Sequence, residues 1–437
     1  MKELKLGVFE TNEIDNIMII GDIHGDYQVF VHCLVDICNV CYISEIKNGI
    51  EILKWNTNNT SIIIFCGDII HRQRYINNVL DDECSDILLL KTIMRLQEES
   101  KNNGGQVIII TGNHEIMNIL NPDDNRYTSP FNIDKNRKYF TNNDFINKFI
   151  HHSYAWIKIN NILISHGGLC SDYLDYLTNT KLKGDDIIEY INNKYKHFFT
   201  DFVKKNKLND KKINKLEDYN LFIKDHESYS TQANIFWCRQ WGFDNVDCNL
   251  LSEKLQKVNC SKMIMAHCPQ FLNPTKPQMI SFKCQNQDDT FKIACVDLGM
   301  SRSFDNNDAL NFYRYLQYNF NRKMSVLKLL HGPNNTLYFN NQSILTHKLS
   351  CIQYLLIKYG LTRDDWKKYN KTSNWLGFDL IEEIIHNPDF KTDCIEDINN
   401  IELTKVNIIN CLLYPIICEK NKHLPSIINF ISLSSDT

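Results

Sequence analysis

The sequence lacks the features that mark nucleic-acid-binding, exported and membrane-spanning proteins. Its 48 lysines and arginines are outnumbered by 52 aspartates and glutamates, and the net charge of −4 offers no basic excess for a nucleic-acid backbone. Residues 1–5 include an acidic side chain and no apolar signal segment, and the longest apolar runs are far shorter than the ~20 residues of a membrane span. We therefore expect a soluble, cytoplasmic protein with neither a nucleic-acid nor a membrane partner.

The composition is that of an ordinary globular protein. Of the 437 residues, 43% are hydrophobic and 23% are charged, which is enough for one large core or two smaller ones. The sixteen cysteines are scattered, and several lie inside apolar runs such as residues 64–66, so we expect buried free thiols in a reducing compartment. Cys38 and Cys41 form a C-x-x-C motif without a second pair at zinc-finger spacing, and we expect them to pack rather than bind metal.

Three short apolar runs, separated by helical patterns, predict a parallel β-sheet. The runs cover residues 17–20, 62–65 and 107–110, and helices are predicted over residues 27–38 and 84–99. Strands joined by helices in this way pair in parallel through right-handed crossovers. Within two residues of its end, each run reaches a glycine that leads into polar residues. Since the carboxyl ends of parallel strands meet at one edge of a sheet, these polar residues are expected to lie together.

The second half of the chain predicts another sheet. Residues 156–165 resemble a hairpin around Asn160-Asn161 that ends at His166-Gly167-Gly168, and a helix over residues 248–258 leads into a strand over 262–266 that ends at His267. Further strand-like runs cover residues 279–283, 291–296, 325–330 and 337–340. We predict an α/β fold in which two mixed β-sheets pack face to face and are flanked by helices.

This fold is expected to occupy residues 1–345. Two insertions are predicted within it: a polar, turn-rich surface segment near the mouth of the site at 121–147, and a Lys-rich and Asn-rich helical cap at 181–232. Residues 346–437 have a helical pattern and form a predicted C-terminal region of unknown role.

Ligand-type side chains follow five of the predicted strands. An Asp, a His and a second Asp can hold one divalent cation, while the second Asp with an Asn and two His can hold another. Such two-metal centres place their ions about 3.5–4 Å apart and bind a hydroxide that attacks phosphorus in line. A single histidine is more often a packed core residue, but five strand ends with ligand-type residues point to a metal site. The six residues are Asp22, His24, Asp68 as the bridge, Asn113, His166 and His267.

The motifs GDIHG, GDxxxR, GNHE and HGG occur in this order between residues 21 and 168. Together they resemble the calcineurin-like metallophosphoesterases of the phosphoprotein-phosphatase type, over roughly residues 17–330. Residues 235–239, 263–267 and 297–302 are similar to the bacterial-like branch called Shewanella-like phosphatases. For this branch the resemblance implies phosphotyrosine or phosphoserine/threonine substrates, with phosphotyrosine often preferred.

The resemblance also implies roles for individual residues. Asp22, His24 and Asp68 would bind the first metal ion, which would be Mn, Fe or Zn. A second ion would be bound by Asp68 together with Asn113, His166 and His267. Arg72, Arg239 and Asn113 would bind the substrate phosphate, and His114 would protonate the leaving oxygen.

One residue departs from the family pattern GDxxDRG. The chain has Gly67-Asp68-Ile69-Ile70-His71-Arg72-Gln73, so His71 replaces an Asp that in the family hydrogen-bonds the equivalent of His114. A carboxylate at that place fixes the imidazole and supports its positive charge. We expect metal binding to survive and proton transfer to weaken. Proton transfer of this kind typically contributes roughly 10²–10⁴-fold to the rate of an enzyme. Aryl phosphates such as phosphotyrosine need this proton least.

The expected function is therefore a dimetal phosphomonoester hydrolase acting on a phosphoprotein or phosphopeptide. One alternative is hydrolysis of a dinucleoside polyphosphate or other nucleotide, because related bacterial enzymes share the motifs. Another is a pseudophosphatase that binds partners without turnover, which the altered His71 supports. Against it stand the six matching ligands and both arginines, because loss of function would sooner remove a ligand. Regulatory partners are not identified by the sequence.

Overall fold

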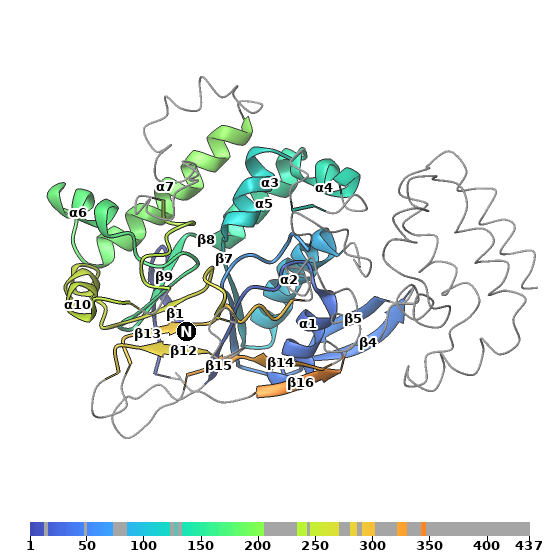
Figure 1. Ribbon diagram of the computed structural model, residues 1–437. Coiled ribbons are helices and arrows are strands. Elements are labelled where there is room, and N and C mark those ends of the chain that lie inside the picture. Colours follow the sequence, from blue (N-terminus) through green and yellow to red (C-terminus); the bar gives the residue numbers. More distant parts are fainter. Residues whose placement is uncertain are drawn as a thin grey trace, which may run out of the picture.

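The computed structural model describes residues 1–12, 16–47, 50–72, 85–122, 127–128, 133–204, 234–242, 245–270, 280–285, 291–301, 321–329 and 342–346. Two β-sheets form the centre of this part of the chain, and helices surround them (Figure 1). The predicted α/β fold with two mixed sheets is confirmed. The predicted strand at 337–340, residues 205–232 of the second insertion and residues 347–437 lie outside the described residues.

The first sheet has five strands in the order β15-β3-β6-β7-β8. Strands β3, β6, β7 and β8 are parallel, and β15 is antiparallel to β3. The apolar runs that predicted the three central strands pair directly with one another, because a β-branched residue on one strand packs against its neighbour on the next. The bounds are β15 (Leu327–Lys328), β3 (Ile17–Ile20), β6 (Ile62–Phe65), β7 (Gln106–Ile110) and β8 (Ser153–Tyr154).

The second sheet has seven strands in the order β1-β2-β9-β10-β11-β13-β12. Its middle strands β10, β11 and β13 are parallel, and β9 and β10 form the predicted hairpin. The bounds are β1 (Lys2–Lys5), β2 (Val8–Glu10), β9 (Trp156–Ile159), β10 (Ile162–Ser165), β11 (Lys262–Met265), β13 (Ile293–Cys295) and β12 (Ser281–Lys283). Two separate ribbons join β4 (Cys41–Lys47) to β5 (Ile50–Trp55) and β14 (Asn321–Ser325) to β16 (Gln342–Thr346).

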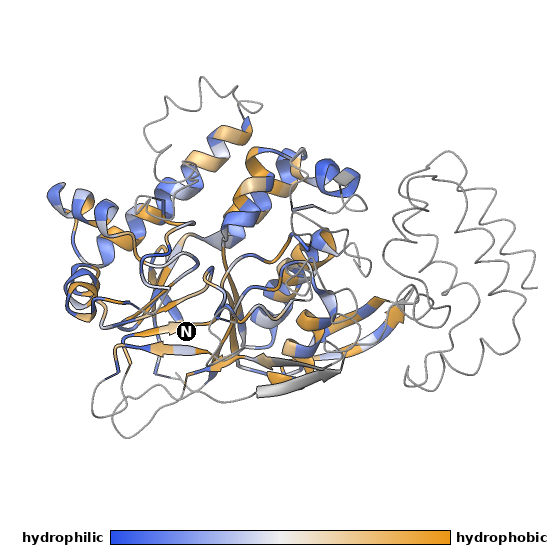
Figure 2. Ribbon diagram, in the orientation of Figure 1, coloured by the Kyte–Doolittle hydropathy of each residue, from blue (hydrophilic) through white to orange (hydrophobic). Residues whose placement is uncertain are grey.

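The central strands of both sheets are covered on both faces. Every residue of β3, β6, β9 and β10 is buried, and side chains from the two sheets belong to one apolar core. A strand that is buried on both sides must be apolar throughout, which explains the continuous runs in the sequence. Figure 2 shows hydrophobic residues concentrated on the central strands, whereas α4 on the outside is mostly hydrophilic.

Helices supply the outer layer. In Figure 1, α3, α4, α5 and α7 lie together on the upper side, while α6 and α10 pack next to each other at the left. The predicted helices over 27–38, 84–99 and 248–258 are confirmed, although the first continues as a π-helical turn over Cys33–Ile37. The bounds are α1 (Tyr27–His32), α2 (Asp86–Asn102), α3 (Asn113–Leu120), α4 (Ile133–Phe140), α5 (Asn143–His152), α6 (Ser171–Asn179), α7 (Asp185–Lys204) and α10 (Cys248–Lys257).

The two segments predicted as insertions contain packed helices. Within 121–147, expected to be turn-rich, lie α4 and the start of α5, and Phe140 and Ile146 are buried. Helix α7 is anchored by buried polar side chains: Asn192 accepts from the Ala155 N–H at 2.9 Å and donates to the Trp156 carbonyl at 2.7 Å. The Tyr195 hydroxyl lies 2.8 Å from the Thr111 hydroxyl. These bonds make α7 part of the core rather than a loose cover.

The cysteines are not all free. Cys248, at the start of α10, forms a disulfide with Cys284, just after β12, so the expectation of free thiols is wrong for these two. Nine other cysteines in the described ranges are free and buried, Cys38 and Cys41 among them. Burial raises the pKa of the Cys41 thiol to about 12, as expected for a packing residue. Among the helices that the structure describes, none is long and apolar enough to cross a membrane.

Candidate metal centre

The carboxyl ends of the parallel strands in both sheets point to one place. Asp22 and Asp68 follow β3 and β6, and Asn113 begins α3 after β7. From the second sheet, His166 follows β10 and His267 follows β11. The two sheets thus bring together side chains that lie up to 245 residues apart in the sequence.

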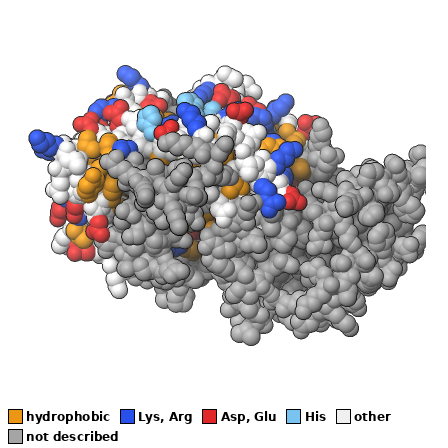
Figure 3. Space-filling model, turned by 90° about the horizontal axis from the view of Figure 1, so that it is seen from above, with side chains coloured by type: hydrophobic (Ala, Val, Ile, Leu, Met, Phe, Trp, Pro, Cys, Tyr) orange, Lys and Arg blue, Asp and Glu red, His pale blue; other side chains and the backbone are white. Residues whose placement is uncertain are grey.

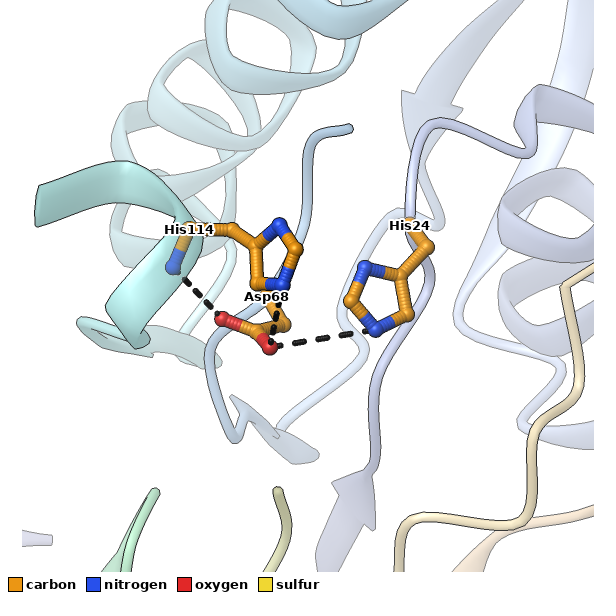
Figure 4. A group of neighbouring side chains, drawn as sticks. All are labelled: His24, Asp68 and His114. Carbon is orange, nitrogen blue, oxygen red and sulfur yellow. Dashed lines mark hydrogen bonds and ion pairs between the residues drawn. The ribbon is translucent and has the colours of Figure 1, made fainter. Parts of the chain in front are cut away.

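Asp68 lies at the centre of this group. Its Oδ2 atom is 3.8 Å from His24 Nε2 and 3.7 Å from His114 Nε2, and Figure 4 shows that a nitrogen of each ring faces this carboxylate. Its Oδ1 atom is 3.3 Å from His166 Nε2. Two sets of metal-binding atoms share Asp68, one with His24 and His114 and the other with His166 and His267, and within each set all atoms lie within 4.8 Å.

The residues predicted as ligands therefore lie close together, and His114 lies beside them. Asp22 Oδ2 is 3.7 Å from His24 Nε2, which joins Asp22 to the first set. Asn113 Oδ1 is 2.9 Å from His166 Nε2, which joins Asn113 to the second. His114, predicted as a proton donor, directs its Nε2 atom toward the same Asp68 carboxylate as the predicted ligand His24 does.

The orientation of the imidazoles fits metal binding. His166 Nδ1 lies 2.7 Å from the Cys66 carbonyl, and His24 Nδ1 lies 3.3 Å from the Ile70 carbonyl. A carbonyl accepts only, so each Nδ1 carries a proton and each neutral ring directs a lone pair from Nε2 into the centre. His166 Nε2 then faces the oxygens of Asp68 and Asn113, which are acceptors as well. A divalent cation satisfies such a gathering of lone pairs.

The pKa shifts of His166, His267 and Asp68 also fit a cation-binding site. Although burial alone lowers it, the Asp68 carboxylate raises the pKa of His166, so a positive charge is favoured at this place. Burial and the charge of Arg239 hold the pKa of His267 well below its ordinary value, which keeps that imidazole in the neutral form that binds metals. Burial acts against ionisation of Asp68, but the charges of His166 and His114 outweigh it and hold its pKa well below the usual range.

Asp22 gives the clearest sign of a cation-binding site. The residue is 1% exposed, and within the described residues its carboxylate oxygens make no hydrogen bond of ordinary geometry, although the His267 backbone and Asp297 lie close enough to influence its charge. Burial, followed by the charges of Asp297 and Asp68, raises the pKa of Asp22 well above its ordinary value. Burial likewise raises the pKa of Asp297 to about 6. Neighbouring buried carboxylates are costly unless a cation neutralises them, so this donor set fits divalent metal ions.

The loops that carry the ligands have unusual backbone conformations. His24, Asp68, His71 and His267 have φ angles of 45°, 49°, 74° and 64°, in the left-handed region that residues other than glycine rarely adopt. Such conformations persist only where surrounding contacts enforce them, and they gather at functional sites.

Glu115 enforces the conformation of the Asp68 loop. Its buried carboxylate accepts hydrogen bonds from the backbone N–H groups of Asp68 at 3.0 Å, Ile69 at 2.8 Å and Gly112 at 2.8 Å. A fourth, from Ile70, is 3.3 Å long. The carboxylate thus ties the end of β6 to the end of β7. Burial, with a further contribution from Asp68, raises the pKa of Glu115 to about 7.

The two predicted phosphate-binding arginines differ. Arg72 is 0% exposed, and its Nη1 atom lies 3.3 Å from the buried Asp26 carboxylate, so its guanidinium is held beneath the loop rather than at the surface. Arg239 is partly exposed and donates to the His267 carbonyl at 2.8 Å, which places it beside the second set of ligands. Of these two described arginines, Arg239 is the one with solvent-exposed surface.

Three residues of the site were missed by the sequence analysis. Asp297 directly follows the strand-like run 291–296, as the predicted ligands follow their strands. Glu115 belongs to the GNHE motif, but its role depends on backbone groups from another loop. Asn118 lies four residues after His114 on α3, and its amide hydrogen-bonds the His71 ring.

Comparisons with known proteins agree with this geometry. Residues 16–244, just over half of the chain, match the calcineurin-like phosphoesterase family. An uncharacterized protein of Acanthamoeba polyphaga mimivirus is 22% identical over 236 residues, which cover 48% of this chain and 87% of that protein.

Solved structures with some similarity include a cold-active protein-tyrosine phosphatase of a psychrophilic Shewanella species and the phosphatase domain of the Legionella effector WipB. The first is 17% identical with a TM-score of 0.47, and the match covers 78% of this chain and 82% of that one. The second is 14% identical with a TM-score of 0.30, and the match covers 53% of this chain and 94% of that one. The match over residues 16–244, together with the donor set around Asp68, identifies the chain as a metal-dependent member of the calcineurin-like phosphoesterase family.

Proposed function

We propose that the protein is a phosphomonoester hydrolase that uses two divalent metal ions. The observation that carries the proposal is the sharing of Asp68 between two sets of ligand atoms. Bound there, two ions would supply a nucleophile at neutral pH and Lewis acidity toward the phosphoryl oxygens. Asp22, His24 and Asp68 would hold one ion, and Asp68 with Asn113, His166 and His267 the other. Mn, Fe and Zn all suit these nitrogen and oxygen ligands.

The protein's own groups would bind and orient the phosphate. The Arg239 guanidinium, held by the His267 carbonyl, can direct its remaining N–H groups at two oxygens of one phosphate. A terminal phosphate presents more free oxygens than a diester, which favours monoesters. The Asn113 side chain supplies a further polar contact, and His114 directs its Nε2 toward the site. Arg72 would have to leave Asp26 before it could join them.

The substrate we propose is a phosphoprotein or phosphopeptide, with phosphotyrosine favoured over phosphoserine. The support is His71, which replaces the carboxylate that would help His114 to protonate a poor leaving group. Charges on the surface are compatible with a protein partner rather than a nucleic acid: Figure 3 shows basic and acidic side chains interspersed over the described part of the upper face.

The competing function is binding without turnover. Two observations favour it, namely His71 in place of an acid and the burial of Arg72. All six metal-ligand positions nevertheless hold residues that bind metals, and a cation would stabilise the buried Asp22 carboxylate, whose pKa burial and the charges of Asp297 and Asp68 raise.

A metal and hydrolysis assay tests the proposal. The purified chain is loaded with Mn²⁺, its metal content is measured by mass spectrometry, and release of p-nitrophenol is followed from the monoester and from bis(p-nitrophenyl) phosphate. We expect close to two ions per chain and faster release from the monoester. Asp68→Asn should lose both properties, whereas Asp201→Asn, an equal charge change at an exposed site on α7, should keep them.

The outcomes separate the candidate functions. Metal binding without release from either ester would support the binding function and refute hydrolysis. Faster release from the diester would refute the monoesterase assignment. If the monoester is preferred, initial rates with phosphotyrosine peptide, phosphoserine peptide and a dinucleoside tetraphosphate identify the substrate class, and a preference for the nucleotide would refute the phosphoprotein assignment.

A further inference from the structure

Asn118 and His114 lie on the same side of α3, and the ring of His71 is inserted between them. The two residues are four apart in a helix, which places them one turn apart on one face. His71 Nδ1 lies 2.8 Å from His114 Nδ1, and the Asn118 amide hydrogen-bonds His71 Nε2. His71 and Asn118 are each 1% exposed and His114 is 8% exposed, so water competes little for these bonds.

Tyr127 closes the outer side of this group. Its ring stacks on His71 with a centroid distance of 5.9 Å and meets His114 edge-on at 4.8 Å. Together with the left-handed backbone at His71, this packing holds the imidazole in the plane in which both of its nitrogens reach their partners.

We propose that Asn118 is a positioning residue that sets the tautomer of His114 through His71 and thereby determines which leaving groups the enzyme expels. The inference rests on the proposed phosphomonoesterase function for its catalytic consequence, but not for the tautomers themselves. No metal ion needs to be present for the hydrogen-bond chain to exist.

The direction of the hydrogen bonds from Asn118 through His71 to His114 follows from donor and acceptor chemistry. The Asn118 Nδ2 group only donates, so His71 Nε2 accepts and the proton of neutral His71 is on Nδ1. That proton is donated to His114 Nδ1, and the proton of His114 is then on Nε2, the atom that faces Asp68. The opposite amide orientation would leave both N–H donors of Asn118 unpaired, whereas the present one pairs a donor and leaves the oxygen without a partner, and buried unpaired N–H groups are rarer than buried unpaired carbonyls.

This arrangement changes what His114 offers to a substrate. When a phosphate monoester is hydrolysed, the oxygen of water bonds to phosphorus, and the ester oxygen leaves with the electron pair of the broken P–O bond. A carboxylate next to His114 Nδ1 would accept its proton and so support transfer of the Nε2 proton to that oxygen. Here Nδ1 accepts from His71, so His114 gives the leaving oxygen a hydrogen bond and the proton comes from solvent. Phenolates tolerate this, whereas alkoxides do not.

The test is the Asn118→Asp variant, which reverses the direction of these hydrogen bonds. Aspartate has nearly the same shape as asparagine. A carboxylate accepts from His71 Nε2, so His71 Nδ1 becomes an acceptor for the Nδ1 proton of His114. We expect the ratio of kcat for an alkyl phosphate to kcat for p-nitrophenyl phosphate to rise at least about tenfold, within the range of general-acid effects. Asn121→Asp, the same change at an exposed position just after α3, should leave the ratio unchanged.

Nuclear magnetic resonance of ¹⁵N-labelled imidazoles reports the tautomers directly in metal-free and Zn²⁺-loaded protein. The expected wild-type spectrum has a protonated Nδ1 on His71 and a protonated Nε2 on His114, and Asn118→Asp should move the His71 proton to Nε2. A protonated Nε2 on wild-type His71 would overturn the inference, even in a protein without hydrolase activity. An inactive protein with the expected tautomers would refute the proposed function alone.

A second variant covers the case in which Asn118→Asp does not fold. His71→Asp places a carboxylate directly at His114 Nδ1 and should raise the same kcat ratio. An unchanged ratio in this folded variant would show that the partner of His114 does not control leaving-group choice, and the inference would be wrong.

Discussion

Replacing Asp297 by Asn should stabilise the metal-free protein and weaken its response to metal. Asp297 is buried beside Asp22, and burial raises its pKa to about 6 from an ordinary value of 3.8. The asparagine keeps the oxygen that accepts from the Gly299 N–H at 3.0 Å, so the change removes a charge with little effect on shape.

The size and the pH range of the effect follow from linkage. Folding disfavours the ionised form of a carboxyl group whose pKa it raises. The resulting loss of stability is absent below the pKa of the unfolded state and complete above the pKa of the folded state. The shift from 3.8 to about 6 corresponds to about 3 kcal/mol. Metal-free wild-type protein should therefore lose about this much stability between roughly pH 4 and pH 6 through Asp297, and the variant should not.

Urea denaturation of chelator-treated protein between pH 4.5 and pH 7.5 measures the effect. At neutral pH the Asp297→Asn variant should unfold at a higher urea concentration than wild type, and the difference should shrink toward low pH. Saturating Mn²⁺ should raise the wild-type midpoint more than that of the variant, because only wild type has this charge to neutralise. Asp201→Asn serves as the exposed control. A metal-free variant that is less stable than wild type at neutral pH would refute the reasoning.

Three further changes probe the surroundings of the site. Glu115→Gln should cost about 2–4 kcal/mol in thermal or urea unfolding, because the amide cannot accept from all four backbone N–H groups that the carboxylate holds. Gly112→Ala should abolish Mn²⁺ binding in calorimetry, since the new Cβ would lie 2.2 Å from the Asp68 backbone nitrogen. Asn192→Leu should lower the free energy of unfolding measured in urea by about 2–4 kcal/mol, since it leaves the Ala155 N–H and the Trp156 carbonyl unpaired.

Much of the fold could be predicted because its central strands are buried on both faces. The runs at 17–20 and 62–65 are apolar at every position, and the observed β3 and β6 have the same bounds. Strand β1 was missed because all four of its residues are exposed and carry no apolar pattern. Helix α4 was missed because its sequence, IDKNRKYF, is mostly polar. Its place in the structure depends on packing against α2 and α5 that no local pattern reveals.

The convergence of the site could be predicted for a related reason. Parallel strands end at a common edge, so Asp22, Asp68 and Asn113 had to be near one another once the strands were placed. The partners of Arg72 could not be predicted in this way. Its ion pair with Asp26 forms across two loops, and both groups are fully buried, whereas the motif alone indicates an arginine that faces a substrate.

The role of His71 is the clearest example of a feature that only the three-dimensional structure shows. In the sequence it is the loss of an acid, and that loss favours a protein without turnover. The spacing of His114 and Asn118 predicts a shared helix face, but not that a ring from a loop more than 40 residues earlier would enter between them. The ring lies there because the backbone at His71 is left-handed, a conformation that cannot be predicted from the residue type. With Asn118 present, every nitrogen of His71 has a partner, so the substitution supports a rewired site rather than a broken one.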